Sequence, residues 1–298
     1  MTHASSPLSS HAVGLIGRGI GASRSPAIHE AEARALGVPL TYRLFDFDAM
    51  AQKSGGWGDE ELGRAVRLMA DIGYSGSNVT FPFKQQVIAH CDELSDEARV
   101  LGAVNTLVFR DGRVRGENTD WIGFSWLVER AFGSIAGASV AQIGTGGAGS
   151  ATALALAQLG AGEVVLFDPE AARAARLADS LSQAVPACRF TVADDVGAAI
   201  APCAGVVNAT PVGMAKLPGV PFDPALMRAD QWLADIIYFP LETELLAAAR
   251  AQGQRVANGV SMVVGQAAEA FRHITGIAPD RERMLARLLA DIAGEQAA

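Results

Sequence analysis

A glycine-rich turn between two apolar runs constrains the fold of this chain more than any other feature. Residues 140–143 are largely apolar, residues 144–149 read GTGGAG, an alanine-rich stretch follows, and a second apolar run at residues 164–167 ends at Asp168. A strand, a glycine turn, a helix, a second strand and an acidic residue in this order are the fingerprint of a dinucleotide-binding βαβ unit. The sequence therefore predicts a doubly wound α/β domain of the Rossmann type around this turn.

The residues of this unit have distinct physical roles. Gly144 permits the tight turn, Gly146 lets the backbone approach a pyrophosphate, and Gly149 lets the helix pack closely on the strand. The pyrophosphate would lie at the helix N-terminus, where N–H groups and the helix dipole favour an anion. Asp168, about 20 residues beyond the glycines, would accept hydrogen bonds from an adenosine ribose and repel a 2′-phosphate. Glycines also occur in ordinary turns, but here the strands, the helix and the acid match as well, and the acid favours NAD over NADP.

Length and charge argue against several classes of protein. At 298 residues the chain is long for one core, so we expect two domains. The net charge of −8 and the lack of any run of Lys or Arg argue against a nucleic-acid partner. The N-terminal segment is polar and no run of about 18 apolar residues occurs, so we expect neither a signal peptide nor a membrane span.

The cysteines and histidines do not have the spacing of disulfide or metal sites. Cys91, Cys188 and Cys203 are odd in number and far apart, which favours reduced thiols in a cytoplasmic protein. The histidines show neither HExxH nor another paired spacing, so we expect no zinc; they are His3, His11, His29, His90 and His273.

Apolar patterns predict alternating strands and helices on both sides of the glycine turn. Before it we expect strands at 13–16, 42–47 and 76–80, helices at 26–36, 60–71, 84–91 and 96–101, and a hairpin of 106–110 with 113–116 around Asp111-Gly112. After it we expect a helix at 171–183 and strands at 189–192, 205–208 and 232–236, which complete a parallel sheet. Helices at 262–274 and 281–293 are expected to pack back on the first domain.

Polar residues gather in four segments outside the nucleotide unit, at the expected ends of strands where pockets form in α/β sheets. These segments are 23–26, 78–84, 102–106 and 117–120. Two serine hydroxyls at 23 and 25 suit a carboxylate, although Ser25 before Pro26 also suits a helix N-cap. Lys84 at the start of a helix opposes the dipole, which is typical of functional sites, although a solvated lysine is the ordinary alternative. The Asn, Thr and Asp residues of the last two segments suit a polyhydroxylated ligand, and they also suit turns.

Together these segments resemble the shikimate dehydrogenase family, and specifically its NAD-dependent quinate/shikimate dehydrogenase branch. The resemblance extends from about Val13 to the C-terminal helix. It rests on Ser23-x-Ser25-Pro26 with His29, Asn78-Val79-Thr80-x-Pro82-x-Lys84, Gly102-Ala103-Val104-Asn105-Thr106, Asn118-Thr119-Asp120, Asn208-Ala209-Thr210-Pro211, and Gly259-x-x-Met262 with Gln266.

The resemblance implies a two-domain α/β enzyme with its site in the cleft between the domains. Residues 1–120 with 259–298 would form the substrate domain, and residues 121–258 the NAD-binding Rossmann domain. Lys84 would be the general acid/base and Asp120 its partner in oxidising a secondary alcohol of a cyclic hydroxy acid, quinate or shikimate. The substrate-binding residues implied are Ser23 and Ser25 for the carboxylate, Thr80, Asn105, Asp120 and Gln266 for ring hydroxyls, and Tyr238 nearby. The cofactor-binding residues implied are Gly144, Gly146, Gly147, Ala148, Gly149, Asp168, Arg173, Thr210, Pro211, Met214, Ile236, Gly259 and Met262.

Several alternatives stay open at this point. Many biosynthetic relatives carry Asn-Arg-Thr where this chain has Phe167-Asp168-Pro169, yet Arg173 lies near enough to allow weaker use of NADP. An NADP-dependent shikimate dehydrogenase or an aminoshikimate-type enzyme is therefore an alternative, and Trp121 and Asn258 depart from the usual residues and leave substrate preference open. A sensor that binds NAD and a cyclic acid without turnover is disfavoured by the presence of both Lys84 and Asp120. His29 is interpreted as structural, and the chain as a monomer or a homodimer.

Overall fold

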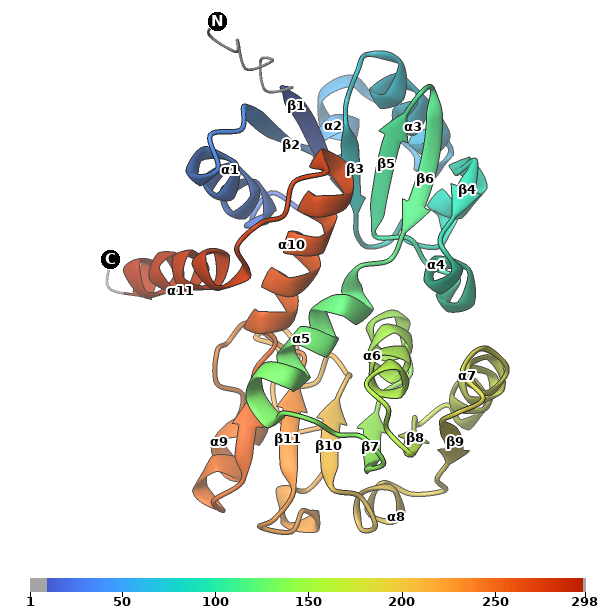
Figure 1. Ribbon diagram of the computed structural model, residues 1–298, viewed down its shortest axis with the longest axis vertical. Coiled ribbons are helices and arrows are strands. Elements are labelled where there is room, and N and C mark those ends of the chain that lie inside the picture. Colours follow the sequence, from blue (N-terminus) through green and yellow to red (C-terminus); the bar gives the residue numbers. More distant parts are fainter. Residues whose placement is uncertain (1–9, 297–298) are drawn as a thin grey trace, which may run out of the picture. The chain divides into compact units, whose positions relative to one another are not determined.

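The protein folds into two compact units, each built on its own six-stranded sheet (Figure 1). In the computed structural model, which describes residues 10–296, the first unit is Met1–Thr119 with Ala267–Ala298, and the second unit is Asp120–Gln266. The predicted α/β class is confirmed. Residues 1–9, which carry His3 and most of the segment examined for a signal peptide, lie outside the described residues.

The sheet of the first unit is mixed. Its order is β2-β1-β3-β5-β6-β4. β1 pairs in parallel with β2 and β3, and β4 with β6, whereas β5 runs antiparallel to β3 and β6. The strands are β1 His11–Gly17, β2 Leu40–Asp46, β3 Gly76–Val79, β4 Glu93–Leu94, β5 Thr106–Arg110 and β6 Arg113–Glu117. The predicted hairpin is confirmed: Asp111 and Gly112 have φ values of 52° and 72°, as a two-residue turn between twisted strands requires.

Helices cover both faces of this sheet. On one face Phe47, Val66 and Met69 form a buried cluster with sheet residues, and on the other face Ile274 packs with Val13 and other strand residues. The helices are α1 Ser25–Ala35, α2 Phe47–Ser54, α3 Leu62–Asp71, α4 Asp96–Leu101, α10 Val260–Thr275 and α11 Arg281–Gln296, with the 3₁₀ turns η1 Asp59–Glu61 and η2 Gln86–His90.

The C-terminal helices pack on the first unit, as predicted, with one exception. α11 is joined to α1 by the ion pair of Arg283 with the buried Glu32, at 2.6 Å. Phe271 of α10 packs against Ala33. The first half of α10, up to Gln266, groups with the second unit.

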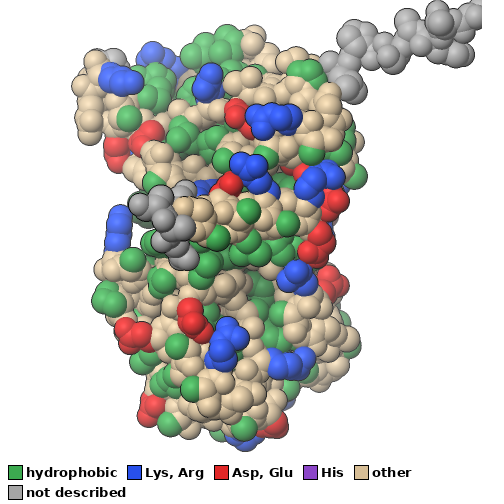
Figure 2. All heavy atoms as spheres, turned by 90° about the vertical axis from the view of Figure 1, so that its left-hand side faces the viewer, with side chains coloured by type: hydrophobic (Ala, Val, Ile, Leu, Met, Phe, Trp, Pro, Cys, Tyr) green, Lys and Arg blue, Asp and Glu red, His purple; other side chains and the backbone are tan. Residues whose placement is uncertain are grey.

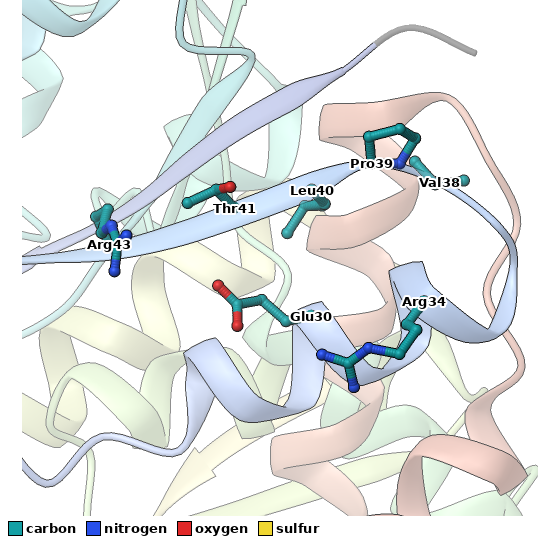
Figure 3. Close-up of a pocket in the computed structure, with 7 residues that line it drawn as sticks. All are labelled: Glu30, Arg34, Val38, Pro39, Leu40, Thr41 and Arg43. Atoms are coloured by element: carbon teal, nitrogen blue, oxygen red, sulfur yellow. The ribbon is translucent and has the colours of Figure 1, made fainter.

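The outer edge of β2 lies beside α1 and carries a cavity of about 430 Å³, lined by Glu30, Arg34, Val38, Pro39, Leu40, Thr41 and Arg43. Figure 3 shows the Glu30 carboxylate pointing from α1 toward the strand. Its Oε1 atom accepts a hydrogen bond from the Tyr42 backbone N–H at 2.8 Å. Because this bond occupies an outward-facing N–H group of an edge strand, it hinders pairing with another chain.

The sheet of the second unit is entirely parallel, in the order β12-β11-β10-β7-β8-β9. This is the Rossmann order, and the predicted doubly wound sheet is confirmed. The strands are β7 Ser139–Ile143, β8 Glu163–Phe167, β9 Arg189–Val192, β10 Gly205–Asn208, β11 Trp232–Asp235 and β12 Arg255–Ala257.

The side chains of alternate residues of β7 point to opposite faces of this sheet. Ala141 and Ile143 join the buried cluster that contains α8 and α9, whereas Gln142 on the other face donates to the Gly149 carbonyl of α6 at 2.7 Å. The helices are α5 Asp120–Phe132, α6 Gly147–Gln158, α7 Ala171–Ala184, α8 Val196–Ile200 and α9 Glu244–Ala251, with the 3₁₀ turn η3 Pro224–Leu226.

Among the local predictions that differ from the structure, three concern how a helix begins. Ser25 is not an N-cap: it is the first residue of α1, and the N-cap position is Arg24, whose side chain makes no capping bond. Lys84 does not begin an α-helix, because it lies in a turn before the short η2. The strand expected to reach residue 47 ends at Asp46, whose side chain accepts from Asp48 N and caps α2.

Charges of both signs are interspersed on the face of the molecule shown in Figure 2. Within residues 10–296, no helix combines the length and the apolar composition that crossing a bilayer demands. The same residues hold no cluster of His, Cys, Asp and Glu suited to a metal ion.

Candidate functional site

The first unit brings the polar segments predicted from its sequence to one edge of its sheet. Thr80 follows β3, Asn105 precedes the antiparallel β5, and the segment 118–120 follows β6. The Asn105 carbonyl accepts from Val79 N at 2.8 Å, and Asn105 N donates to the Glu117 carbonyl at 3.0 Å. These backbone bonds fix the three strand ends side by side.

A chain of side-chain hydrogen bonds connects these segments through the protein interior. Ser23 Oγ donates to Ser25 Oγ at 3.2 Å, and Ser25 is hydrogen-bonded to the hydroxyl of Tyr42. Tyr42 Oη in turn donates to Asn78 Oδ1 at 2.8 Å. Burial raises the pKa of the Tyr42 hydroxyl, so it remains a donor.

The same chain continues to the segments 102–106 and 117–120. Asn78 Nδ2 donates to Thr106 Oγ1 at 3.0 Å, and Thr106 Oγ1 donates to Asn105 Oδ1 at 3.0 Å. Asn105 Nδ2 donates to Thr119 Oγ1 at 3.1 Å, beside Asp120 in the sequence. The serine pair and the Asn105 amide therefore belong to one connected network, which restricts the rotamers of both.

Lys84 is held beside this network by its backbone. Its carbonyl accepts from Val104 N at 2.8 Å, one residue before Asn105. Its side chain is partly buried. Asp120 is buried at 8 % exposure and begins α5, in the second unit.

His29, interpreted as structural, is buried in α1 against the ring of Tyr42, with ring centroids 4.9 Å apart. Burial lowers its pKa to about 4, so the ring is neutral near pH 7.

The glycine turn of the second unit has the geometry that a pyrophosphate requires. Gly144 has φ of +97°, which strongly favours glycine. A Cβ on Gly149 would lie 2.4 Å from the Gly144 carbonyl oxygen, whereas a Cβ on Gly146 or Gly147 would meet nothing within 4 Å. Gly146 is the N-cap of α6 and supplies no capping side chain. An open cradle at an uncapped helix N-terminus fits a dinucleotide pyrophosphate.

Asp168 lies at the end of β8 and is bonded to this glycine turn. Its Oδ2 atom accepts from Thr145 N at 2.9 Å and from Thr145 Oγ1 at 2.8 Å, and its Oδ1 atom accepts from Glu170 N at 2.9 Å. Arg173 Nη1 is 3.6 Å from Oδ1. Burial alone would raise the pKa of Asp168, but these hydrogen bonds, with a smaller contribution from Arg173, hold it below its usual range. The carboxylate is therefore ionised and fixed in orientation.

Thr210 lies on the other side of the glycine turn, after β10. A Cβ on Gly144 would approach Thr210 Cγ2 to 2.9 Å, so the two loops touch. β7 and β10 are neighbours where the strand order reverses, and this is where open α/β sheets bind ligands.

A second buried network orients the Thr210 loop. Asn208 Oδ1 accepts from Thr210 N at 3.0 Å and from Thr210 Oγ1 at 2.7 Å, and Asn208 Nδ2 donates to Asp235 Oδ1 at 3.1 Å. Asp235 also accepts from Ile237 N and Thr243 Oγ1. Burial raises the pKa of Asp235 to about 6, although each of these bonds acts to lower it.

The remaining predicted residues of the second unit lie after β10, β11 and β12 and on α10. Gly259 follows β12, and a Cβ there would lie 2.0 Å from the Ile236 carbonyl oxygen. On α10, Met262 is buried and Gln266 packs against Gly123 of α5. Pro211, Met214 and Tyr238 lie on exposed loops.

Two segments of the chain match family models. Residues 15–107 match the family model described as the shikimate dehydrogenase substrate binding domain, and residues 259–289 match that of the shikimate 5′-dehydrogenase C-terminal domain. A shikimate dehydrogenase (NADP(+)) from Streptomyces avermitilis is 46% identical over 290 residues, covering 97% of this chain and 98% of the relative. The chain belongs to the shikimate dehydrogenase family.

Other members of the shikimate dehydrogenase family are named for NAD instead of NADP. A quinate/shikimate dehydrogenase (NAD(+)) from Corynebacterium efficiens is 42% identical, covering 93% of this chain and 97% of the relative. The solved quinate dehydrogenase from Corynebacterium glutamicum in complex with NAD has a TM-score of 0.86 and 40% identity, covering 94% of this chain and 99% of that structure. The family thus includes close relatives of both cofactor types.

The sequence patterns did not assign a role to several residues whose hydrogen bonds connect the predicted site residues. Tyr42 occupies an inward position of β2 and has the pattern of an ordinary core residue. Asn78 and Thr119 lie within the motifs, but only the structure shows them linking Ser25 to Asn105. In the second network, Asn208 and Thr210 lie within a motif, and Asp235 could have been found as a polar residue that ends an apolar strand.

Proposed function

We propose that this protein is an NAD-dependent quinate/shikimate dehydrogenase. The reaction removes the hydroxyl proton and the C–H hydride from a secondary alcohol of the cyclic acid and leaves a ketone, and it is reversible. The first unit would bind the acid and the second unit the cofactor. When bound, NAD supplies the hydride acceptor at its nicotinamide ring.

Asp168 carries the cofactor part of this proposal. Its carboxylate is ionised, buried and fixed by three hydrogen bonds at the end of β8. A ribose hydroxyl can donate to Oδ1, whereas a 2′-phosphate would face a like charge that cannot turn away. The glycine cradle on α6 would hold the pyrophosphate, and the Thr210 loop would border the nicotinamide half.

The hydrogen-bonded chain of the first unit supports the substrate part. A carboxylate on the ring would receive hydrogen bonds from Ser23 and Ser25, and the Asn105 amide would bond ring hydroxyls. Thr80, Tyr238 and Gln266 are proposed as further substrate contacts on the family's pattern. Lys84 Nζ would accept the hydroxyl proton as the hydride leaves and return it in the reverse reaction, and Asp120 would orient the ammonium group.

A second candidate is an NADP-dependent shikimate dehydrogenase. The relative from Streptomyces avermitilis, named for NADP, is 46% identical. Arg173 and Arg176 lie at the start of α7, where a 2′-phosphate would come, but both are paired with Glu170. That pairing reduces the positive charge available to a phosphate, so the structure favours the first candidate.

Initial rates with quinate or shikimate, each with NAD or NADP, test the proposal directly. We expect kcat/KM with NAD to exceed that with NADP by at least about tenfold for the better acid, because a fixed anion lies against the 2′-position. The production of reduced nicotinamide is followed by absorbance. A preference for NADP would establish the second candidate, and no turnover with either acid would contradict both.

Replacing Tyr42 by phenylalanine tests the hydrogen-bonded chain. The change removes the hydroxyl that Ser25 bonds and that donates to Asn78, so we expect the KM for the acid to rise about 3- to 10-fold while the KM for NAD is unchanged. Because the side-chain oxygen Asn78 Oδ1 loses its donor, the free energy of unfolding should also fall by about 1–3 kcal/mol. Tyr74→Phe, in the same unit, is the matched control. An unchanged KM for the acid would show that the chain does not position the serines.

A further inference from the structure

Thr145 makes two contacts with a single carboxylate oxygen. Its backbone N–H and its hydroxyl both donate to Asp168 Oδ2, at 2.9 and 2.8 Å. Thr145 is 3% exposed, so water does not replace these bonds readily. A carboxylate oxygen has two lone-pair sites, and Thr145 fills both on Oδ2.

The other oxygen of Asp168 keeps a free position. Oδ1 accepts one strong hydrogen bond, from Glu170 N at 2.9 Å, and Arg173 Nη1 is farther away at 3.6 Å. Of the two carboxylate oxygens, Oδ1 therefore keeps a lone-pair site for a further donor such as a ribose hydroxyl. The Thr145 hydroxyl thus determines which oxygen of the Asp168 carboxylate is available to the ribose and how the plane of the carboxylate is oriented.

The hydroxyl at this position is not required by the turn itself. The conformational demands of the turn fall on Gly144, with its φ of +97°, and on Gly149, where a Cβ would meet the Gly144 carbonyl oxygen at 2.4 Å. Thr145 reaches Asp168 with its hydroxyl, and valine would fill nearly the same volume without donating. Thr145→Val therefore removes the hydrogen-bond donor and leaves the volume of the side chain nearly unchanged.

We propose that Thr145 is a positioning residue that sets the selectivity of this chain for NAD over NADP by fixing the Asp168 carboxylate. The inference rests on the proposed function and deepens it. Without the hydroxyl, Asp168 keeps its charge but loses one of the three hydrogen bonds that fix its orientation, so the carboxylate can rotate toward the guanidinium of Arg173. Oδ1 is then no longer held for the ribose, and a 2′-phosphate meets a carboxylate that can move aside.

The experiment compares Thr145→Val, which removes the hydroxyl, with Thr145→Ser, which keeps it. Dissociation constants for NAD and for NADP are measured by calorimetry with the full-length protein and no acid, and KM and kcat are measured separately. For Thr145→Val we expect the dissociation constant for NAD to rise about tenfold and that for NADP to change less than about threefold. Thr145→Ser should stay within about twofold of the wild type for both, and kcat and the KM for the acid should be unchanged in both variants.

The outcomes separate this inference from the proposed function. If the wild type prefers NAD and Thr145→Val keeps the same ratio of dissociation constants, the role of Thr145 is overturned and the proposed function stands. If the wild type prefers NADP, both are overturned. If both cofactors weaken equally in Thr145→Val, Thr145 only supports the turn and the inference fails. Thermal unfolding verifies that the variants fold, and Thr145→Ala provides the same comparison should the valine variant not fold.

Discussion

Replacing Lys84 by methionine is expected to lower kcat between about 10²- and 10⁴-fold while the dissociation constant for NAD stays within about twofold. The lower kcat follows from losing the only group proposed to take the hydroxyl proton, since general base catalysis contributes an effect of this size. Methionine keeps the length and much of the apolar stem of lysine. The Lys84 carbonyl, which accepts from Val104 N at 2.8 Å, is not changed by the substitution.

Lys53→Met is the matched control, because Lys53 is an exposed lysine in the last turn of α2 in the same unit. It should retain the wild-type kcat. Rates are measured at saturating acid and cofactor, and NAD binding is measured by calorimetry. A kcat for Lys84→Met within about tenfold of the wild type would remove Lys84 from the mechanism.

The nucleotide-binding half of the fold could be predicted because its constraints are local. The glycines, the apolar strand β8 and Asp168 lie within one βαβ unit, and each has a steric or electrostatic reason that depends only on near neighbours. β9 and β10 were predicted with the bounds that the structure has. Short elements such as β4 and β12 were not predicted, since two or three residues have no detectable periodicity.

Helix α5 also escaped prediction. α5 begins at Asp120, directly after a polar motif interpreted as a site, and its first turns contain Trp121 and Gly123 in place of strong helix formers. Its Gly123 packs against the backbone of α10, with an added Cβ only 2.4 Å from the Met262 carbonyl oxygen. That tertiary contact is what requires the glycine, and no sequence window contains both partners.

The hydrogen bonds of the candidate site also join residues distant in the sequence, so local patterns could not predict them. Motifs placed Ser25 and Asn105 in one site, but the path between them runs through Tyr42 and Asn78, which are far apart in the sequence. An inward-facing tyrosine on a strand normally indicates core packing. Whether its hydroxyl has a partner depends on the strand pairing of β1 with both β2 and β3, and this pairing is a long-range property.

Replacing Asp120 by asparagine is expected to lower kcat about 10²-fold, and its effect should not multiply with that of Lys84→Met. Asparagine preserves the shape of the side chain but removes the charge proposed to orient the lysine ammonium group. When two residues act as one unit, the first substitution already removes their joint contribution to catalysis. The double variant should therefore have nearly the kcat of Lys84→Met alone.

The control for this cycle is Asp179→Asn, since Asp179 is an exposed aspartate on α7 in the same unit as Asp120. It should leave kcat unchanged, and combined with Lys84→Met it should add nothing. Asp120 begins α5, where a carboxylate favours the helix dipole, so Asp120→Asn also lowers the free energy of unfolding by about 0.3–1 kcal/mol. If the factors by which Lys84→Met and Asp120→Asn lower kcat multiply in the double variant, the two residues act independently and the proposed pair is wrong. If the factors do not multiply, the lysine depends on that carboxylate for its role in proton transfer.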